Sequence, residues 1–347
     1  PGQRERFPCP SSLLHNGLRG HNMNCGANDN CGAVDQERLQ ADRQQQAERL
    51  RYQHFKGRVL VTGHAGYIGQ TVCNRLRYLG IPYIGMDSKT GSDVFFPAHV
   101  QLAFQTCPDI TAVIHLAAVS SVGQCEAEPE LALANNLIGT NSLLSVLSDQ
   151  RKPPRVVFAS SQAVKAQPIS GVYAATKKLA ERELSHYFTA TSAPCFALRV
   201  ANVAGGNHES RTHLIPNLVR SVAYPPFDLT ADPEKTVRDF VHVEDVAEAF
   251  IHFATIDVGP SFHYLDICSG QPYSIYDLMG LVYRRWGRTI QYNRKPDRKG
   301  DFARIQDNNP VHARQLGWSP TLGIERILDD AKNALAKNDT YRRAYGG

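Results

Sequence analysis

The sequence has no long apolar run and no recognisable export signal. No segment approaches the roughly 20 apolar residues of a membrane-spanning helix, and no basic-then-apolar stretch resembles a secretory signal peptide. The eight cysteines are scattered, and no two form the CxxC pair of a zinc ribbon or a thioredoxin-like redox centre. Several lie in apolar runs, where reduced cysteine behaves as a small hydrophobic residue. We therefore expect a cytoplasmic protein without membrane contact and without a bound metal.

A strong excess of charge is also missing. The 347 residues carry 38 Lys and Arg against 33 Asp and Glu, a formal net charge of +5. The basic residues gather near 284–304 and in the N-terminal segment rather than in one dense stripe. This mild excess favours anionic small molecules, and we expect no nucleic-acid partner. The length suits one large α/β domain, or two lobes that share a cleft.

The first 56 residues differ in composition from the rest. They combine early Pro, Gly, Asn and Cys with the polar stretch DQERLQADRQQQAERLRYQHF at 35–55. We expect 1–56 to be a polar and largely flexible extension, with a surface helix over 35–55. Because the chain starts at Pro1 rather than Met, we expect part of this extension to be vector-derived.

From Arg58 onward, short apolar runs alternate with stretches of helical periodicity. The apolar runs are typical of strands buried on both faces, and the alternation predicts right-handed βαβ units with a doubly wound parallel sheet. The expected strands are 58–63, 83–87, 112–117, 155–160, 195–200 and 262–268. The expected helices lie near 67–79, 131–148, 172–191, 211–223, 243–256 and 274–287.

The first expected strand runs directly into TGHAGYIG. Gly63, Gly66 and Gly69 have the GxxGxxG spacing that permits a tight turn and a close approach of backbone N–H groups to a pyrophosphate. Asp87 follows 18 residues later, at the end of the second strand. An acid there accepts both ribose hydroxyls of NAD and repels the 2′-phosphate of NADP. The loop therefore predicts an NAD site.

A second motif, YAATK, places Tyr173 and Lys177 four residues apart on one helix face. A tyrosine base near neutral pH needs its pKa lowered by about 3 units, and a nearby ammonium favours that shift. The motif follows a strand that ends in Ser160 and Ser161, where a hydroxyl can hydrogen-bond a reacting oxygen. This combination predicts acid–base chemistry beside a dinucleotide.

Further motifs extend the pattern along the chain. They are VIHLAA (113–118), NNLIGT (135–140), FASSQAV (158–164), RVANVAGG (199–206), HLIP (213–216), VRDFVHVEDVAEA (237–249) and RKGD (298–301). With the glycine loop and YxxxK, they resemble the extended short-chain dehydrogenases, and more closely the UDP-glucose 4-epimerase group, over about 58–335.

The resemblance implies a Rossmann core at 57–200 and a smaller, mainly substrate-binding lobe at 201–347, with a return to the core sheet around 240–268. It implies the catalytic residues Ser161, Tyr173 and Lys177. The implied NAD-binding residues are Gly63, Gly66, Tyr67, Ile68, Gly69, Asp87, Asp93, Val94, Leu116, Ala117, Ala118, Asn136 and Lys177. The implied substrate-binding residues are Ser161, Asn202, His213, Leu214, Arg238, Arg298 and Asp301.

Three departures from the 4-epimerase pattern concern the sugar side. Only 12 positions separate Ser161 from Tyr173, about half the usual spacing. Lys165 stands where the group often has tyrosine, and Ser120 where many members have lysine. Ile305, four positions after Asp301, stands where a bulky tyrosine can exclude an N-acetyl group. We therefore expect tolerance of enlarged sugars.

The expected activity is NAD-dependent epimerisation of a nucleotide-diphosphate sugar, with UDP-sugars favoured, through a 4-keto intermediate. A dehydratase or decarboxylase remains open, although Gln162 and Ala163 follow Ser161 where such enzymes carry acids. A ketoreductase and a non-catalytic NAD-binding protein are further alternatives. The segment 131–147 is apolar nearly all round, and in this family such a helix pairs with a second subunit, so we expect a homodimer.

Overall fold

The computed structural model describes residues 30–210, 213–224, 226–296 and 308–336. The chain divides into two units, 1–46 and 47–347. The described part of the first unit belongs to α1 (Asn30–Arg51), which covers most of the helix expected at 35–55 and is largely exposed from residue 40 onward. Within the described residues, no helix is long and apolar enough to cross a bilayer.

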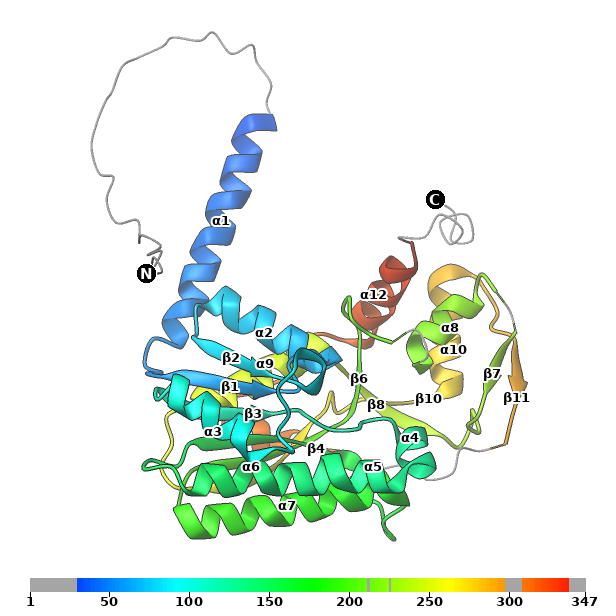
Figure 1. Ribbon diagram of the computed structural model, residues 1–347. Coiled ribbons are helices and arrows are strands. Elements are labelled where there is room, and N and C mark those ends of the chain that lie inside the picture. Colours follow the sequence, from blue (N-terminus) through cyan, green and yellow to red (C-terminus); the bar gives the residue numbers. More distant parts are fainter. Residues whose placement is uncertain (1–29, 211–212, 225, 297–307, 337–347) are drawn as a thin grey trace, which may run out of the picture. The chain divides into compact units, whose positions relative to one another are not determined.

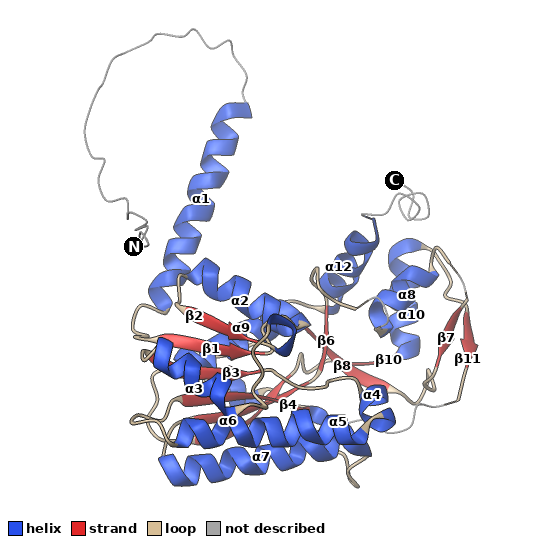
Figure 2. Ribbon diagram, viewed as in Figure 1, coloured by secondary structure: helices blue, strands red, loops and turns tan. Residues whose placement is uncertain are grey.

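A six-stranded parallel sheet forms the centre of the second unit, which confirms the predicted doubly wound α/β fold (Figure 2). Its spatial order is β2-β1-β3-β4-β5-β9. The strands are β1 (Arg58–Thr62), β2 (Tyr83–Met86), β3 (Ile110–His115), β4 (Arg155–Ser161), β5 (Cys195–Val200) and β9 (Phe262–Ile267). The last of them brings the chain back to the sheet from the C-terminal half.

Helices cover both faces of this sheet (Figure 1). One face carries α2 (Tyr67–Leu79) and α9 (Val243–Thr255), and the other carries α3 (Pro97–Thr106), α6 (Gly139–Ser148) and α7 (Gly171–Thr191). In β1, Val59 and Val61 pack into the first of these two cores and Leu60 into the second. Because successive strand residues point to opposite faces, a strand buried on both sides must be apolar throughout.

The helix expected at 131–148 is present, and residues 129–148 are helical throughout, with a π-helical turn inside the helix. The structure has α4 (Val122–Ala127) and α5 (Pro129–Leu133), then a π-helical turn at Ala134–Ile138, before α6 begins. The turn contains Asn136, whose side chain bonds to the backbone of Val119 outside the helix. π-Helical turns are rare and occur frequently at functional sites.

The C-terminal half adds a smaller lobe with its own apolar core. Its small sheets are β10-β8-β6 and β11-β7, and every strand in them except β8 has three residues, too few to be recognised from sequence periodicity. The strands are β6 (Asn202–Ala204), β7 (Phe227–Leu229), β8 (Val237–His242), β10 (Pro272–Ser274) and β11 (Tyr292–Arg294). The helices are α8 (Leu214–Ser221), α10 (Ile275–Trp286), α11 (Val311–Gln315) and α12 (Ile324–Ala336).

The segment just before β1 packs on the core rather than extending from it. Tyr52 and Phe55 contact the apolar cluster under α2 and α9. The Tyr52 hydroxyl donates to Glu248, and Arg75 forms ion pairs with Glu48 at 2.6 Å and with Glu248 at 2.9 Å. The packed unit therefore begins several residues before Gly57, where the sequence placed its start.

Candidate active site

The predicted cofactor loop lies at the point where the strand order of the sheet reverses. From β1 the chain passes to β2 on one side and then to β3 on the other, which opens a crevice at the carboxyl ends of β1 and β3. Gly63 has a φ of +70°, and a Cβ there would lie 2.6 Å from the backbone nitrogen of Ala117. A Cβ on Gly69 would lie 2.1 Å from the Gly63 carbonyl oxygen. Only glycine fits at both positions.

The start of α2 is suited to an anionic group. Its N-cap residue, Gly66, provides no side-chain cap, and the first turn contains no acidic residue. The first N–H groups of a helix have no partners within it, and they attract phosphate. Tyr67 and Ile68 belong to this first turn, and the Tyr67 hydroxyl donates to the carbonyl of Gly205, at the end of β6. The loop is thereby joined to the C-terminal lobe.

Asp87 stands beside this loop. Its carboxylate accepts hydrogen bonds from the backbone N–H of Ala65 at 3.1 Å and from that of Lys89 at 3.0 Å. The side chain is only half-buried, so the carboxylate is accessible to a ribose. An uncapped helix start, a close glycine turn and a partly exposed acid at the end of β2 together fit the dinucleotide that the sequence predicts.

The other predicted cofactor residues follow β3 and η1 (Ser88–Thr90). Leu116 and Ala117 donate backbone hydrogen bonds to Thr62 at 3.1 and 3.3 Å, which holds the 116–118 segment, including Ala118, against the end of β1. Val94 is buried, and the Asp93 carboxylate accepts from the N–H of Phe95 at 2.9 Å.

Tyr173 and Lys177 lie on the first two turns of α7, and Ser161 ends β4. Burial raises the pKa of Tyr173 to about 12, while a hydrogen bond with the Ser161 hydroxyl acts in the lowering direction. The hydroxyl therefore keeps its proton at neutral pH in the ligand-free protein. The pairing brings together the two groups that the sequence predicted to share the reacting oxygen.

Lys177 is 3% exposed. Burial lowers the pKa of its ammonium to about 8. Nζ donates to the carbonyl of Ala159 at 2.8 Å and lies 4.9 Å from the ring centroid of Phe158. The lysine is thus anchored to the end of β4 rather than bonded to the Tyr173 hydroxyl.

Asn136 connects several parts of this site. Its side-chain oxygen accepts from the N–H of Val119 at 2.8 Å, and its nitrogen donates to the Val119 carbonyl at 3.0 Å and to Thr176 Oγ1 at 3.2 Å. The Thr176 hydroxyl in turn donates to the carbonyl of Tyr173 at 2.9 Å. Asn136 is fully buried, so it acts by holding the segment after β3 against the catalytic helix.

Sequence reasoning missed an acid that caps the catalytic helix. The N-cap residue of α7, Ser170, makes no side-chain cap. Instead, the Glu126 carboxylate on α4 accepts the N–H of Val172 at 2.6 Å. A carboxylate at a helix N-terminus is favourable for hydrogen bonding and for the helix dipole. No local pattern identifies this cap, because the two residues are 46 positions apart.

The two serines at the end of β4 have different environments. Ser160 is buried and donates at 2.7 Å to Glu181, whose carboxylate also takes two hydrogen bonds from Arg199. Ser161 is the one that reaches Tyr173. Ser161 therefore stays the candidate catalytic serine.

The predicted substrate residues are only partly gathered in the described structure. Asn202 is exposed at the start of β6, and His213 is exposed at the N-cap of α8 with its ring centroid 6.3 Å from that of Tyr67. Leu214 packs in the core of the C-terminal lobe, and Arg238 is buried in β8, where it donates to the Val237 carbonyl. Arg298, Asp301 and Ile305 lie outside the described residues.

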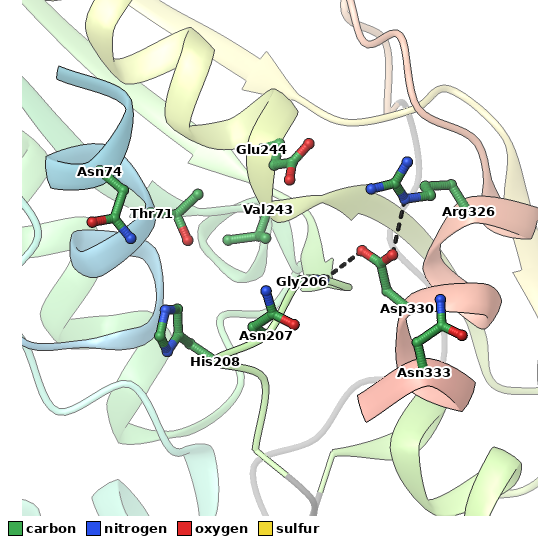
Figure 3. Close-up of a pocket in the computed structure, with 10 residues that line it drawn as sticks. All are labelled: Thr71, Asn74, Gly206, Asn207, His208, Val243, Glu244, Arg326, Asp330 and Asn333. Carbon is green, nitrogen blue, oxygen red and sulfur yellow. Dashed lines mark hydrogen bonds and ion pairs between the residues drawn. The ribbon is translucent and has the colours of Figure 1, made fainter. Parts of the chain in front are cut away.

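A polar cavity of about 300 Å³ lies between α2, the turn after β6, and helices α9 and α12 (Figure 3). At its edge, Asp330 accepts from the N–H of Gly206 and from Arg326, each at 2.8–2.9 Å. Asp330 also lies 2.8 Å from His242 Nε2. None of the predicted site residues lines this cavity, so it is separate from the catalytic group.

The chain is similar in sequence and in structure to several known proteins. A UDP-glucose 4-epimerase from Streptomyces lividans is 29% identical over 324 residues, which cover 80% of this chain and 95% of that protein. The structure of a Thermus thermophilus UDP-glucose 4-epimerase in complex with NAD is similar at a TM-score of 0.69 and 25% identity, over 82% of this chain and 99% of that one. MoeE5 in complex with UDP-glucuronic acid and NAD gives a TM-score of 0.70 at 25% identity, over 81% and 99%.

The sequence profile of the NAD dependent epimerase/dehydratase family matches residues 59–268. This span contains the glycine loop, Asp87, Ser161 and the YxxxK pair, so the predicted family and cofactor are confirmed. The chain belongs to the NAD dependent epimerase/dehydratase family and is an NAD-dependent enzyme with a doubly wound Rossmann sheet.

Proposed function

We propose that the enzyme epimerises a UDP-sugar at C4 through a 4-keto intermediate. The observation that carries this proposal is the contact between Tyr173 and Ser161 at the end of β4, one strand away from the cofactor crevice. When bound, NAD⁺ accepts the hydride and returns it. The residues of the chain supply the proton transfer and hold the sugar in place.

In the forward half-reaction, Tyr173 as phenolate takes the proton of the C4 hydroxyl, and the Ser161 hydroxyl donates a hydrogen bond to the same oxygen. C4 loses its hydride at that moment and becomes a ketone. After the sugar turns over in the site, the hydride returns to the opposite face, and Tyr173 gives the proton back to the oxygen. Such positioned proton transfer is typically worth about 100- to 10,000-fold in rate.

The pKa of Tyr173, raised to about 12 by burial, sets a requirement for this mechanism. A favourable positive charge must reach the phenol before it can act as a base near neutral pH. Lys177 lies one helical turn further on, with its ammonium held at the end of β4. We therefore expect activity to depend strongly on Lys177.

The substrate class is proposed from the relatives. The Streptomyces lividans protein is a UDP-glucose 4-epimerase, and MoeE5 was solved with UDP-glucuronic acid. Incubation with UDP-glucose, UDP-GlcNAc and UDP-glucuronate, with products resolved by NMR, tests the proposal directly. A C4 epimer of at least one UDP-sugar is expected, and the absence of any epimer would refute it.

The same experiment separates the alternatives. A dehydratase would form a 4-keto-6-deoxy sugar, and a decarboxylase would release CO₂ from UDP-glucuronate. A ketoreductase would consume or release free NADH. The amide of Gln162 and the methyl group of Ala163, directly after Ser161, offer no acid for elimination, which favours epimerisation. Conversion of UDP-GlcNAc at a rate near that of UDP-glucose would support the expected tolerance of enlarged sugars.

We further propose that the enzyme is a homodimer. Leu131, Leu133, Ile138 and Leu179 are between 37 and 52% exposed on α5, the π-helical turn and α7. Burial of such side chains against a second copy removes apolar surface from water. Light scattering at micromolar concentration should give a dimer, and Ile138→Glu with Leu179→Glu should give a monomer. A monomeric wild-type protein would refute the assembly.

The cytoplasmic location expected from the sequence stays a prediction.

A further inference from the structure

The side-chain amide nitrogen of Gln162 is buried without a hydrogen-bond partner in the described part of the chain. The side chain of Gln162 is 3% exposed. Buried amide groups in folded proteins nearly always have a partner, because desolvation without one is unfavourable. An unpaired amide nitrogen of this kind indicates that a bound ligand accepts its hydrogen bond when the protein functions.

The position of Gln162 relates it to the catalytic residues. It is the first residue of the short 3₁₀ turn η3 (Gln162–Lys165), directly after Ser161. The turn is held at its start by the Ser161 hydroxyl, which accepts the N–H of Ala163 at 3.2 Å. It is held at its end by an ion pair of 2.7 Å between Lys165 and Asp266. The backbone of Gln162 is therefore fixed directly after the residue whose hydroxyl bonds to Tyr173.

The chemistry of the group limits its role. A carboxamide does not titrate, so Gln162 cannot supply or take the proton of a reaction. It can donate a hydrogen bond from Nε2 to an oxygen atom. Sugar hydroxyl and ring oxygens are acceptors of this kind, and the proposed substrate brings a sugar to the neighbouring Ser161.

We propose that Gln162 is a substrate-binding residue whose amide donates a hydrogen bond to an oxygen of the sugar, and which is left unpaired while no sugar is bound. The proposal rests on the proposed nucleotide-sugar substrate. It assigns to the turn after β4 a recognition role that differs from the acid–base role of Tyr173.

Gln162→Met tests this proposal, because methionine has nearly the same shape and no donor. The protein is used with its bound NAD. Isothermal titration should give about a tenfold weaker affinity for UDP-glucose, the loss expected for one hydrogen bond. The affinity for UDP, which has no sugar, should stay within about twofold. In the absence of sugar, the variant should melt about 2 °C higher or more, because an unpaired buried amide has been removed.

Gln150→Met is the matched control. Gln150 is partly buried, and its amide donates to the Val146 carbonyl at 2.8 Å at the end of α6. This variant should melt at a lower temperature and bind UDP-glucose as the wild type does.

Three results would overturn the proposal for Gln162. The first is an unchanged affinity of Gln162→Met for UDP-glucose. The second is an equal loss for UDP and UDP-glucose, or a loss of bound NAD, which would place the contact elsewhere. The third is a lower melting temperature, which would indicate a structural partner. Because the test measures binding, its result can be interpreted even if the wild type binds UDP-glucose but does not epimerise it.

Discussion

Lys177→Met should make the ligand-free protein more stable, although it removes a residue proposed for catalysis. The ammonium is almost fully buried, and its pKa is lowered from 10.5 to about 8 by that burial. A difference of about 2.5 units corresponds to about 3 kcal/mol by which burial of the charge disfavours folding near neutral pH. Methionine keeps the apolar stem and loses the hydrogen bond from the charged ammonium to Ala159, worth about 2 kcal/mol. The net gain at pH 7 is therefore about 1 kcal/mol.

The pH dependence of the stability difference distinguishes the burial of the Lys177 charge from a packing effect. Between pH 8 and 10.5, the folded wild type has released the Lys177 proton while the unfolded chain still holds it. The stability of the wild type relative to Lys177→Met therefore rises with pH across this window. Below pH 8 the stability gain of the variant over the wild type should have its full value, and above pH 10.5 the gain should be gone.

Urea unfolding of both proteins, freed of bound nucleotide, at pH 7, 8.5 and 10 measures this difference. Titrating groups that do not interact with Lys177 contribute equally in both proteins and cancel. A variant that is less stable than the wild type at pH 7, by an amount that does not change with pH, would refute the argument that a buried charge is present at residue 177.

Tyr173→Phe should lower turnover by about 100- to 10,000-fold with nearly unchanged NAD content, measured by product formation and nucleotide release; more than about a tenth of wild-type turnover would contradict the acid–base role. Asp87→Ala should weaken NAD binding by about tenfold or more and narrow the preference for NAD over NADP, because the carboxylate predicted to accept the ribose hydroxyls is lost. Titration with both nucleotides measures this, and an unchanged preference would count against Asp87. Glu126→Ala should lower kcat with little change in KM, because α7 loses its cap, whereas Glu126→Gln keeps an acceptor for Val172 and should restore kcat. Equal kcat values for the wild type and both variants would exclude a positioning role.

Local sequence was sufficient for the central sheet and the cofactor loop. The strands of a doubly wound sheet are buried on both faces, so runs such as RVLVT must be apolar whatever surrounds them. Gly63 and Gly69 are required by close backbone approaches that recur wherever a strand turns into a helix at a pyrophosphate. The helical spacing of Tyr173 and Lys177 is likewise a property of the chain itself.

The tertiary structure alone decided how the catalytic helix is held and which polar groups lack partners. Glu126 reaches Val172 across 46 positions, and Asn136 reaches Thr176 across 40. Neither contact leaves a periodic pattern, because the partners come from different elements. The three-residue strands of the C-terminal lobe were missed because three residues carry too little periodicity. The unpaired amide of Gln162 and the lowered pKa of Lys177 follow from burial, which depends on how the whole chain packs around them.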